Sequence, residues 1–140
     1  IPTSGMPWGV VLSPDGSTIV ATTYEGTIDV FDSATRARRA TARASTRLIP
    51  GITFSPDGKL LAIGDENGIV EVWDATTLRA LMTLDTRGVE VVSVSFDPTG
   101  RYLAEGTSQR FTSVYDLRAM DGNIAGNLEY QKQRIGARTP

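Results

Sequence analysis

Carboxylates, lysines, tyrosines and hydroxyls are the groups in this chain that could do chemistry, because its 140 residues include neither His nor Cys. Ser-His-Asp and Cys-His nucleophile systems are therefore excluded, as are metal sites that depend on imidazole or thiolate ligands. The most regularly placed carboxylates are Asp15, Asp57 and Asp97, in turns that begin 42 residues apart, at positions 13, 55 and 97. An Asp in such a turn commonly accepts hydrogen bonds from its own backbone. We therefore expect structural roles for these three, with no catalytic residue, no metal and no cofactor.

A second set of acids recurs at the same spacing, each directly after an aromatic residue. These acids are Asp32, Asp74 and Asp116, and they follow Phe31, Trp73 and Tyr115. Three apolar columns keep the same register: Val10, Ile52 and Val94; Leu12, Phe54 and Phe96; Ile19, Leu61 and Leu103. Units of about 40 to 45 residues that end in an aromatic residue plus Asp are typical of four-stranded β-propeller blades. The second set of acids is therefore expected to end third strands.

The middle unit contains four strand patterns. Short β-rich runs at 51–54, 60–63, 69–73 and 79–84 are separated by turn sequences, of which Ser-Pro-Asp-Gly is the first. The second and third runs are apolar on both faces, as expected for a sheet covered on both sides. The fourth runs, at 36–42 and 79–84, are more polar, which predicts outer strands at a solvent-exposed rim. The fold class is therefore all-β: propeller blades made of three four-stranded antiparallel sheets.

The turns, the run Gly-Ile-Val-Glu-Val-Trp-Asp at 68–74 and the matching run at 26–32 resemble the WD-repeat family of β-propellers. The resemblance covers residues 6 to about 118 and implies a propeller segment. In that family a Gly-His pair, a Ser or Thr, a turn Asp and the Trp form a structural hydrogen-bond network. This chain has no His, and Glu25, Asn67 and Gln109 hold the usual turn Asp position, so that network cannot form in its usual way.

The expected organisation is one partial propeller domain over 1–140, with blades at about 6–47, 48–89 and 90–133 and a tail at 134–140. The third blade is irregular: Arg110 replaces the glycine of the other units, and Leu128 and Tyr130 suggest a final strand after a longer connection. Propellers typically need four to eight blades to close a ring. We expect either further blades in a longer parent chain, which the absence of an initial Met favours, or a homo-oligomer such as a six-bladed dimer.

Composition restricts the class of partner. The formal net charge of −2 gives no overall positive field, so neither nucleic acid nor an anionic membrane is the expected partner. A basic stretch at Arg36, Arg38, Arg39, Arg43 and Arg47 has few interleaved aromatic residues and is interpreted as a solvated rim. No apolar run is long enough to span a bilayer. A soluble, cytoplasmic protein is the expectation.

WD-repeat proteins commonly bind partners with the loops before the first strand and between the second and third strands of each blade. The resemblance places Trp8, Arg47 and Glu90 near the first kind of loop, and Tyr24, Glu66 and Arg110 in the second kind. Exposed Trp, Tyr and Arg residues dominate interface energetics. The competing interpretation of Trp8 is a core residue packed between blades.

The predicted function is a non-catalytic scaffold for protein–protein interaction, as a propeller segment of a larger regulatory or signalling protein that binds a protein or peptide. One alternative is a part of a propeller enzyme or small-ligand sensor. Another is a repeat unit whose only role is self-assembly. Fold alone does not choose among them.

Overall fold

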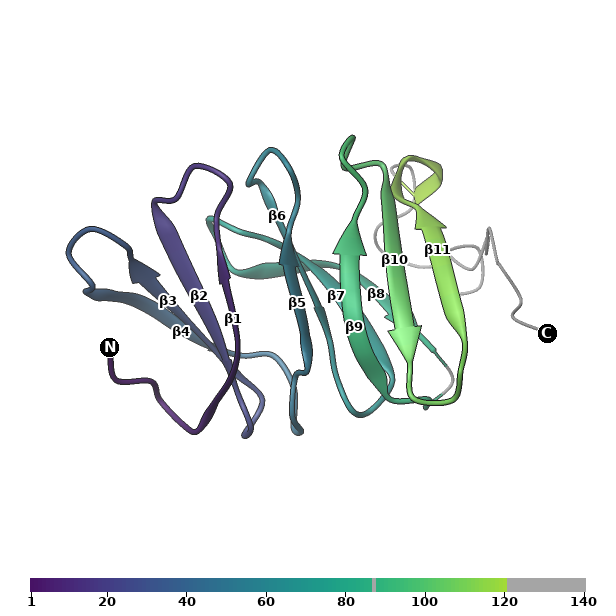
Figure 1. Ribbon diagram of the computed structural model, residues 1–140, viewed down its shortest axis with the longest axis horizontal. Coiled ribbons are helices and arrows are strands. Elements are labelled where there is room, and N and C mark those ends of the chain that lie inside the picture. Colours follow the sequence, from purple (N-terminus) through teal and green to yellow (C-terminus); the bar gives the residue numbers. More distant parts are fainter. Residues whose placement is uncertain (87, 121–140) are drawn as a thin grey trace.

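Three antiparallel sheets stand side by side in chain order in the computed structural model, which describes residues 1–86 and 88–120 (Figure 1). The first has the order β1-β2-β3-β4, the second β5-β6-β7-β8 and the third β11-β10-β9. The strands are β1 Pro7–Leu12, β2 Thr18–Thr23, β3 Thr27–Asp32, β4 Arg38–Arg43, β5 Gly51–Phe54, β6 Leu60–Gly64, β7 Ile69–Asp74, β8 Arg79–Asp85, β9 Val91–Phe96, β10 Tyr102–Thr107 and β11 Thr112–Asp116. A 3₁₀ turn, η1, follows at Leu117–Met120. It is too short to cross a membrane, and the described residues contain no other helix.

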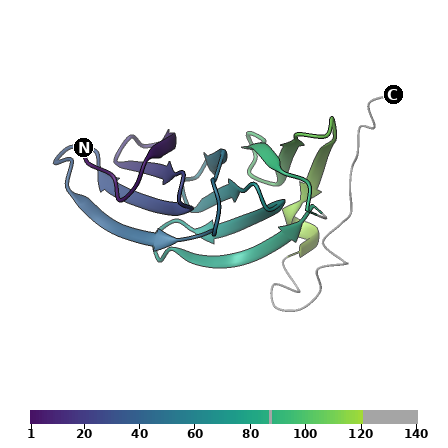
Figure 2. The same ribbon diagram turned by 90° about the horizontal axis from the view of Figure 1, so that it is seen from below.

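The sheets meet through their first strands. β1 contacts β5, and β5 contacts β9, whereas β4 and β8 lie on the other side of the row (Figure 2). This arrangement explains the polarity of the strands, because β4 and β8 border solvent while β2, β3, β6 and β7 are covered on both faces. The all-β fold class and the antiparallel sheets predicted from the sequence are confirmed.

Two apolar clusters fill the junctions between neighbouring sheets. Between the first and second sheets lie Val20, Ile28, Val30, Ile49, Phe54, Leu61, Ile63 and Trp73. Between the second and third lie Ala62, Val70, Val72, Met82, Leu84, Val91, Val94, Leu103, Tyr115 and Leu117. The three recurring apolar columns contribute to both clusters, which is why they keep one register in the sequence.

The strand boundaries differ from the sequence prediction mainly at β4. It begins at Arg38 because Arg36 adopts a left-handed backbone with φ of 62°, which ends the preceding turn. Leu78 occupies the equivalent position before β8 with φ of 53°. The third sheet has three strands within the described residues, and the fourth strand predicted around Leu128 and Tyr130 lies outside them.

One face of β1 is bare. The side chains of Trp8, Val10 and Leu12 are 60%, 68% and 55% exposed. The repeat places Ile52 and Phe54 at the positions of Val10 and Leu12, and both pack against the cluster between the first two sheets. A core role for Trp8 is therefore wrong for this chain, because no described sheet covers the outer face of β1.

Candidate binding surface at the linker edge

The sheets present two opposite edges. We call one the linker edge: it consists of the segments before β1, β5 and β9 and the turns β2–β3, β6–β7 and β10–β11. The other, the turn edge, consists of the turns β1–β2, β3–β4, β5–β6, β7–β8 and β9–β10. In Figure 1 these edges face down and up, respectively. All six predicted binding residues lie at the linker edge.

Trp8 and Tyr24 form an aromatic pair at the linker edge of the first sheet. Trp8 lies in β1 and Tyr24 in the β2–β3 turn, where its backbone N–H donates to the carbonyl of Met6. The ring centroids are 6.3 Å apart, with planes inclined at 62°, an edge-to-face arrangement. Tyr24 is 52% exposed, so both rings are accessible.

Arg47 and Glu66 form an ion pair at the linker edge of the second sheet. Nε of Arg47 lies 3.2 Å from Oε2 of Glu66, and the Arg47 side chain is 61% exposed. Such an exposed pair contributes only about 0 to 1 kcal/mol to stability, so both groups remain open to exchange for a partner's charges.

Glu90 and Arg110 lie at the linker edge of the third sheet. The backbone N–H of Ser108, in the β10–β11 turn, donates to the carbonyl of Glu90. Arg110 has φ of 65°, close to the 84° and 81° of Gly26 and Gly68 at the equivalent positions. The structure thus places the six residues along a single edge, where Trp8 contacts Tyr24 and Arg47 contacts Glu66.

The N-terminal segment is held against the first sheet by a buried acid. Asp29 is fully buried and accepts hydrogen bonds from the Ser4 N–H at 2.5 Å and the Thr41 hydroxyl at 2.6 Å. Burial would raise the pKa of Asp29, but these hydrogen bonds and the nearby Arg38 guanidinium outweigh it and lower the pKa. Arg38 also donates to the Pro2 carbonyl at 2.6 Å. Sequence analysis missed this contact, since nothing in the motif singles out Asp29.

The turn acids have the structural roles expected of them. Oδ1 of Asp15 accepts the N–H of Ser17 at 2.9 Å, and Oδ1 of Asp57 accepts that of Lys59 at 3.0 Å. Asp32 and Asp74 accept backbone N–H groups in the turns that follow β3 and β7. No group of three or more potential metal ligands occurs in the stretches 1–86 and 88–120.

A family model described as "WD domain, G-beta repeat" matches residues 40–74, which contain β5, β6 and β7. Solved structures share the arrangement of all three sheets. The β-propeller domain of Cps50 (Swd1) from Myceliophteria thermophila aligns with a TM-score of 0.77 at 18% identity, over 83% of this chain and 37% of that one. The chain has the fold of a WD-repeat β-propeller.

Two further solved structures agree. The WD40 repeats of RRP9 align with a TM-score of 0.80 at 19% identity over 84% of this chain and 37% of that one. U3-55K aligns with a TM-score of 0.80 at 18% identity over 84% and 38%. The chain therefore spans less than half the length of these propellers, and identities this low establish the fold alone. No curated protein sequence matches the chain as a relative.

Where the WD-repeat family has its histidine network, this chain has a different one. In the second blade the Ser45 hydroxyl, in the segment before β5, donates to Oδ2 of Asp65 at 2.5 Å, and both residues are buried. Asp65 also accepts the Ile69 N–H at 2.9 Å, and Asn67 donates to both Ser45 and Asp65 at 3.3 Å. In place of the usual network, which cannot form without His, Ser45, Asp65 and Asn67 form a hydrogen-bonded group. The sequence motif alone did not predict this group.

The WD tryptophan itself makes a local contact. Nε1 of Trp73 donates to Oε2 of Glu71 at 2.8 Å, within the same strand. Burial raises the pKa of Glu71, more than the Trp73 hydrogen bond lowers it. Glu71, Asp65 and Asn67 line a cavity of about 300 Å³ beside the connection from β4 to β5. The other side of this cavity is formed by Arg43 to Thr46, at the end of β4 and the start of the connection to β5.

Proposed function

We propose that this chain is a non-catalytic docking segment of a larger propeller protein, and that its linker edge binds a protein or peptide. The observation that carries the proposal is the exposed edge-to-face pair of Trp8 and Tyr24. Aromatic side chains provide large, rigid contact areas at low entropic cost and are the residue types most enriched among interface hot spots. Two such rings in contact and exposed to solvent supply an anchor that a partner side chain can cover.

A sheet that preceded β1 would cover part of the aromatic pair, because Pro50 and Glu66, at the second-sheet positions of Trp8 and Tyr24, are half-buried; the rest of the pair would stay accessible. Val92, at the third-sheet position of Trp8, is 43% exposed although the second sheet lies beside it. Ser108, at the position of Tyr24, is also exposed. Partner binding through Trp8 and Tyr24 is therefore compatible with further blades in the parent protein.

The neighbouring sheets would add polar rim contacts. Arg47 and Glu66 can exchange their mutual ion pair for charges on a partner, while Glu90 and Arg110 extend the surface in the same direction. An aromatic centre with a charged rim is the usual anatomy of a protein interface.

The bare face of β1 supports a parent chain longer than this one. Ile52 and Phe54 pack against the preceding sheet, and we propose that a further four-stranded sheet of the parent protein packs in the same way on Val10 and Leu12. The solved propellers, of which this chain spans less than half, support the same proposal.

Sedimentation equilibrium of the 140-residue chain over a concentration series tests whether a further sheet of the parent chain or a second copy covers the bare face of β1. A mass that stays near 15.0 kDa supports the parent-chain proposal. A mass of twice that value that returns to the monomer in Leu12→Glu would show instead that a second copy covers β1.

Selection from a random peptide library displayed on phage tests the docking edge. Peptides enriched on the wild-type chain should lose binding to Trp8→Ala and Tyr24→Ala, each by tenfold or more if the pair is a hot spot worth about 2 kcal/mol. Arg79→Ala, an exposed residue near the turn edge, is the control and should bind as wild type. Enrichment unaffected by either aromatic substitution would contradict the proposed site.

A further inference from the structure

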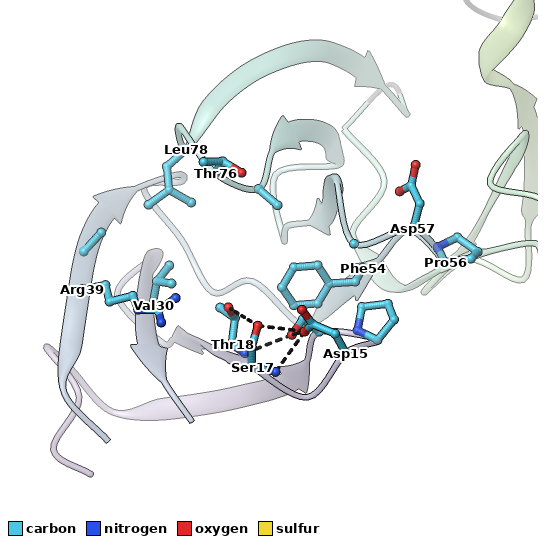
Figure 3. Close-up of a pocket in the computed structure, with 15 residues that line it drawn as sticks. Asp15, Ser17, Thr18, Val30, Arg39, Phe54, Pro56, Asp57, Thr76 and Leu78 are labelled. Carbon is cyan, nitrogen blue, oxygen red and sulfur yellow. Dashed lines mark hydrogen bonds between the residues drawn. The ribbon is translucent and has the colours of Figure 1, made fainter. Parts of the chain in front are cut away.

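A cavity of about 890 Å³ opens at the turn edge, between the first and second sheets (Figure 3). It lies at the opposite edge from Trp8 and Tyr24. The turns β1–β2, β5–β6 and β7–β8 and the strands β3 and β4 contribute to its lining, which includes Val30, Phe54 and Leu78 as apolar wall and Asp15, Asp57 and Arg39 as charged groups.

Three small residues keep this cavity open. Thr18, Ala40 and Ala75 line it. At the next junction, between the second and third sheets, the repeat places Leu60, Met82 and Leu117 at the same three positions. Met82 and Leu117 are buried in the cluster between those sheets, and Leu60 packs against it. The fold can therefore fill this space with its own side chains, and does so at one junction but not at the other.

The cavity combines an apolar wall with a polar mouth. In Figure 3 the Phe54 ring lies near the centre of the view, with Asp15 beside it. Phe54 and Val30 belong to the core cluster and are fixed by it, and Ala40, Ala75 and Leu78 pack against that cluster. Preformed sites with apolar walls and a few placed polar groups are the usual form of a binding pocket.

Asp15 gives the mouth a negative charge, and within 1–86 and 88–120 no Lys or Arg forms an ion pair with it. Its Oδ1 accepts hydrogen bonds from the Ser13 hydroxyl at 2.6 Å and from the N–H and hydroxyl of Ser17 at 2.9 and 2.8 Å. These hydrogen bonds lower the pKa of Asp15 to about 2, so the carboxylate is ionised at neutral pH. Among the described residues, no protein donor occupies Oδ2, which is free to accept from a ligand.

Arg39, the cation that lines the mouth, is already paired, and Asp57 adds a second carboxylate. Arg39 forms an ion pair with Asp32. The pKa of Asp57 is lowered by hydrogen bonds from Ser55 and Lys59 and, to a smaller extent, by the charge of Lys59. Asp15 and Asp57 therefore leave the mouth with a net negative charge, which is complementary to a cation.

We propose that this cavity is a second docking site, which binds a partner peptide through an apolar side chain next to a Lys or Arg. The partner's apolar side chain occupies the cavity, which is equivalent to the space that Met82 and its neighbours fill at the next junction. The adjacent cation of the partner pairs with Asp15. No residue of the linker edge takes part in this site. The test of the cavity is therefore independent of the function proposed above.

The test is an NMR titration of the 140-residue chain with acetyl-Gly-Leu-Lys-Leu-Gly-amide at millimolar concentrations. The amide signals of Ser17, Gly58 and Thr76, which line the cavity, should shift, and those of Gly26 and Gly68 at the linker edge should not. The same peptide with Glu in place of Lys should bind at least about fivefold more weakly, because it places like charges together.

Two variants separate the apolar and the ionic contributions. The triple change Thr18→Leu, Ala40→Met and Ala75→Leu copies the filled junction and should abolish the shifts while the melting temperature stays level or rises. Asp15→Asn should weaken binding about threefold, as expected for one exposed ion pair. Asp97→Asn, which weakens the corresponding turn of the third sheet, is the matched control and should leave the dissociation constant unchanged.

Absence of any shift at the cavity in the wild-type chain, or equal binding of the Lys and Glu peptides, would overturn the proposal. Full binding by a folded triple variant would do the same. If the triple variant does not fold, the comparison of Asp15→Asn with Asp97→Asn still decides, because both retain the cavity wall.

Discussion

The hydroxyl of Ser45 donates a 2.5 Å hydrogen bond to Oδ2 of Asp65, joining the segment that enters the second sheet to the end of β6. Both residues are less than a tenth exposed. Asp65 is held by hydrogen bonds from Ser45, Asn67 and the Ile69 N–H rather than by a cation. This contact fixes the path of the chain between two blades, a role that a histidine has in the usual WD-repeat network.

Ser45→Ala should lower the free energy of unfolding by about 1 to 3 kcal/mol, because a buried carboxylate loses its shortest hydrogen bond. Urea denaturation followed by tryptophan fluorescence measures the change. Thr112→Ala, at an exposed position of β11, is the control and should stay within about 0.5 kcal/mol of wild type. Equal losses in the two variants would refute a structural role for the Ser45 to Asp65 contact.

Arg110→Gly should raise the free energy of unfolding by roughly 1 kcal/mol, since Arg110 has a left-handed backbone with φ of 65° that costs a residue with a Cβ about that much. The contrasting change is Gly26→Ala. It should destabilise the chain, because the added Cβ would lie 2.3 Å from the carbonyl oxygen of Ser45. Thermal unfolding of both variants checks the pair. A loss of stability in Arg110→Gly would show that the arginine side chain contributes more than its backbone costs.

The repeat spacing predicted the sheets because strand, turn and core positions all return every 42 residues, so each column is supported three times. The roles of Asp15 and Asp57 could also be predicted, because an Asp in such a turn accepts hydrogen bonds from the backbone next to it. The Ser45 to Asp65 contact and the burial of Asp29 could not be predicted, since they depend on how a connecting segment lies across a neighbouring sheet. The exposure of Trp8 likewise depends on whether another sheet covers β1, which no local pattern encodes.

The cavity shows a second kind of limit. The repeat alignment does contain the signal, because Thr18, Ala40 and Ala75 stand where Leu60, Met82 and Leu117 stand in the next unit. Only the structure shows that these three columns meet at one place between two sheets. A difference in side-chain size at any one repeat position does not by itself predict a cavity.

Glu71→Gln should stabilise the chain at pH 7, and the gain should disappear as the pH falls. Burial raises the pKa of Glu71, so the folded state disfavours its ionised form, and wild-type stability declines as the pH rises through the interval between the unfolded and folded pKa values. Gln keeps an acceptor for Nε1 of Trp73 and carries no charge. Unfolding curves from pH 4 to 8 measure the difference between variant and wild type. A difference that does not change with pH would contradict the raised pKa.

Leu12→Ala and Phe54→Ala compare one repeat position in two environments. Phe54 is 9% exposed within the cluster between the first two sheets, whereas Leu12 is 55% exposed on the bare face of β1. We expect Phe54→Ala to cost about 3 to 5 kcal/mol and Leu12→Ala no more than about 0.5 kcal/mol. Chemical denaturation of the 140-residue chain provides both values. A large cost for Leu12→Ala would mean that β1 is covered in solution, and the sedimentation experiment would then identify a second copy as the cover.

Asp29→Asn should release the N-terminal segment and remove part of the chain's acid sensitivity. The pKa of Asp29 is lowered in the folded state, so its contribution to stability is present above its unfolded pKa and is lost as the pH falls through the folded pKa. In the variant an amide faces the Ser4 N–H and the Thr41 hydroxyl, and at least one of these donors loses its acceptor. Hydrogen exchange at the Ser4 amide should be faster in Asp29→Asn than in wild type at pH 6, and the two should converge as the pH drops below the folded pKa of Asp29. Unchanged exchange at Ser4 would show that the segment is held by other contacts, of which the Arg38 hydrogen bond to the Pro2 carbonyl is the next to remove.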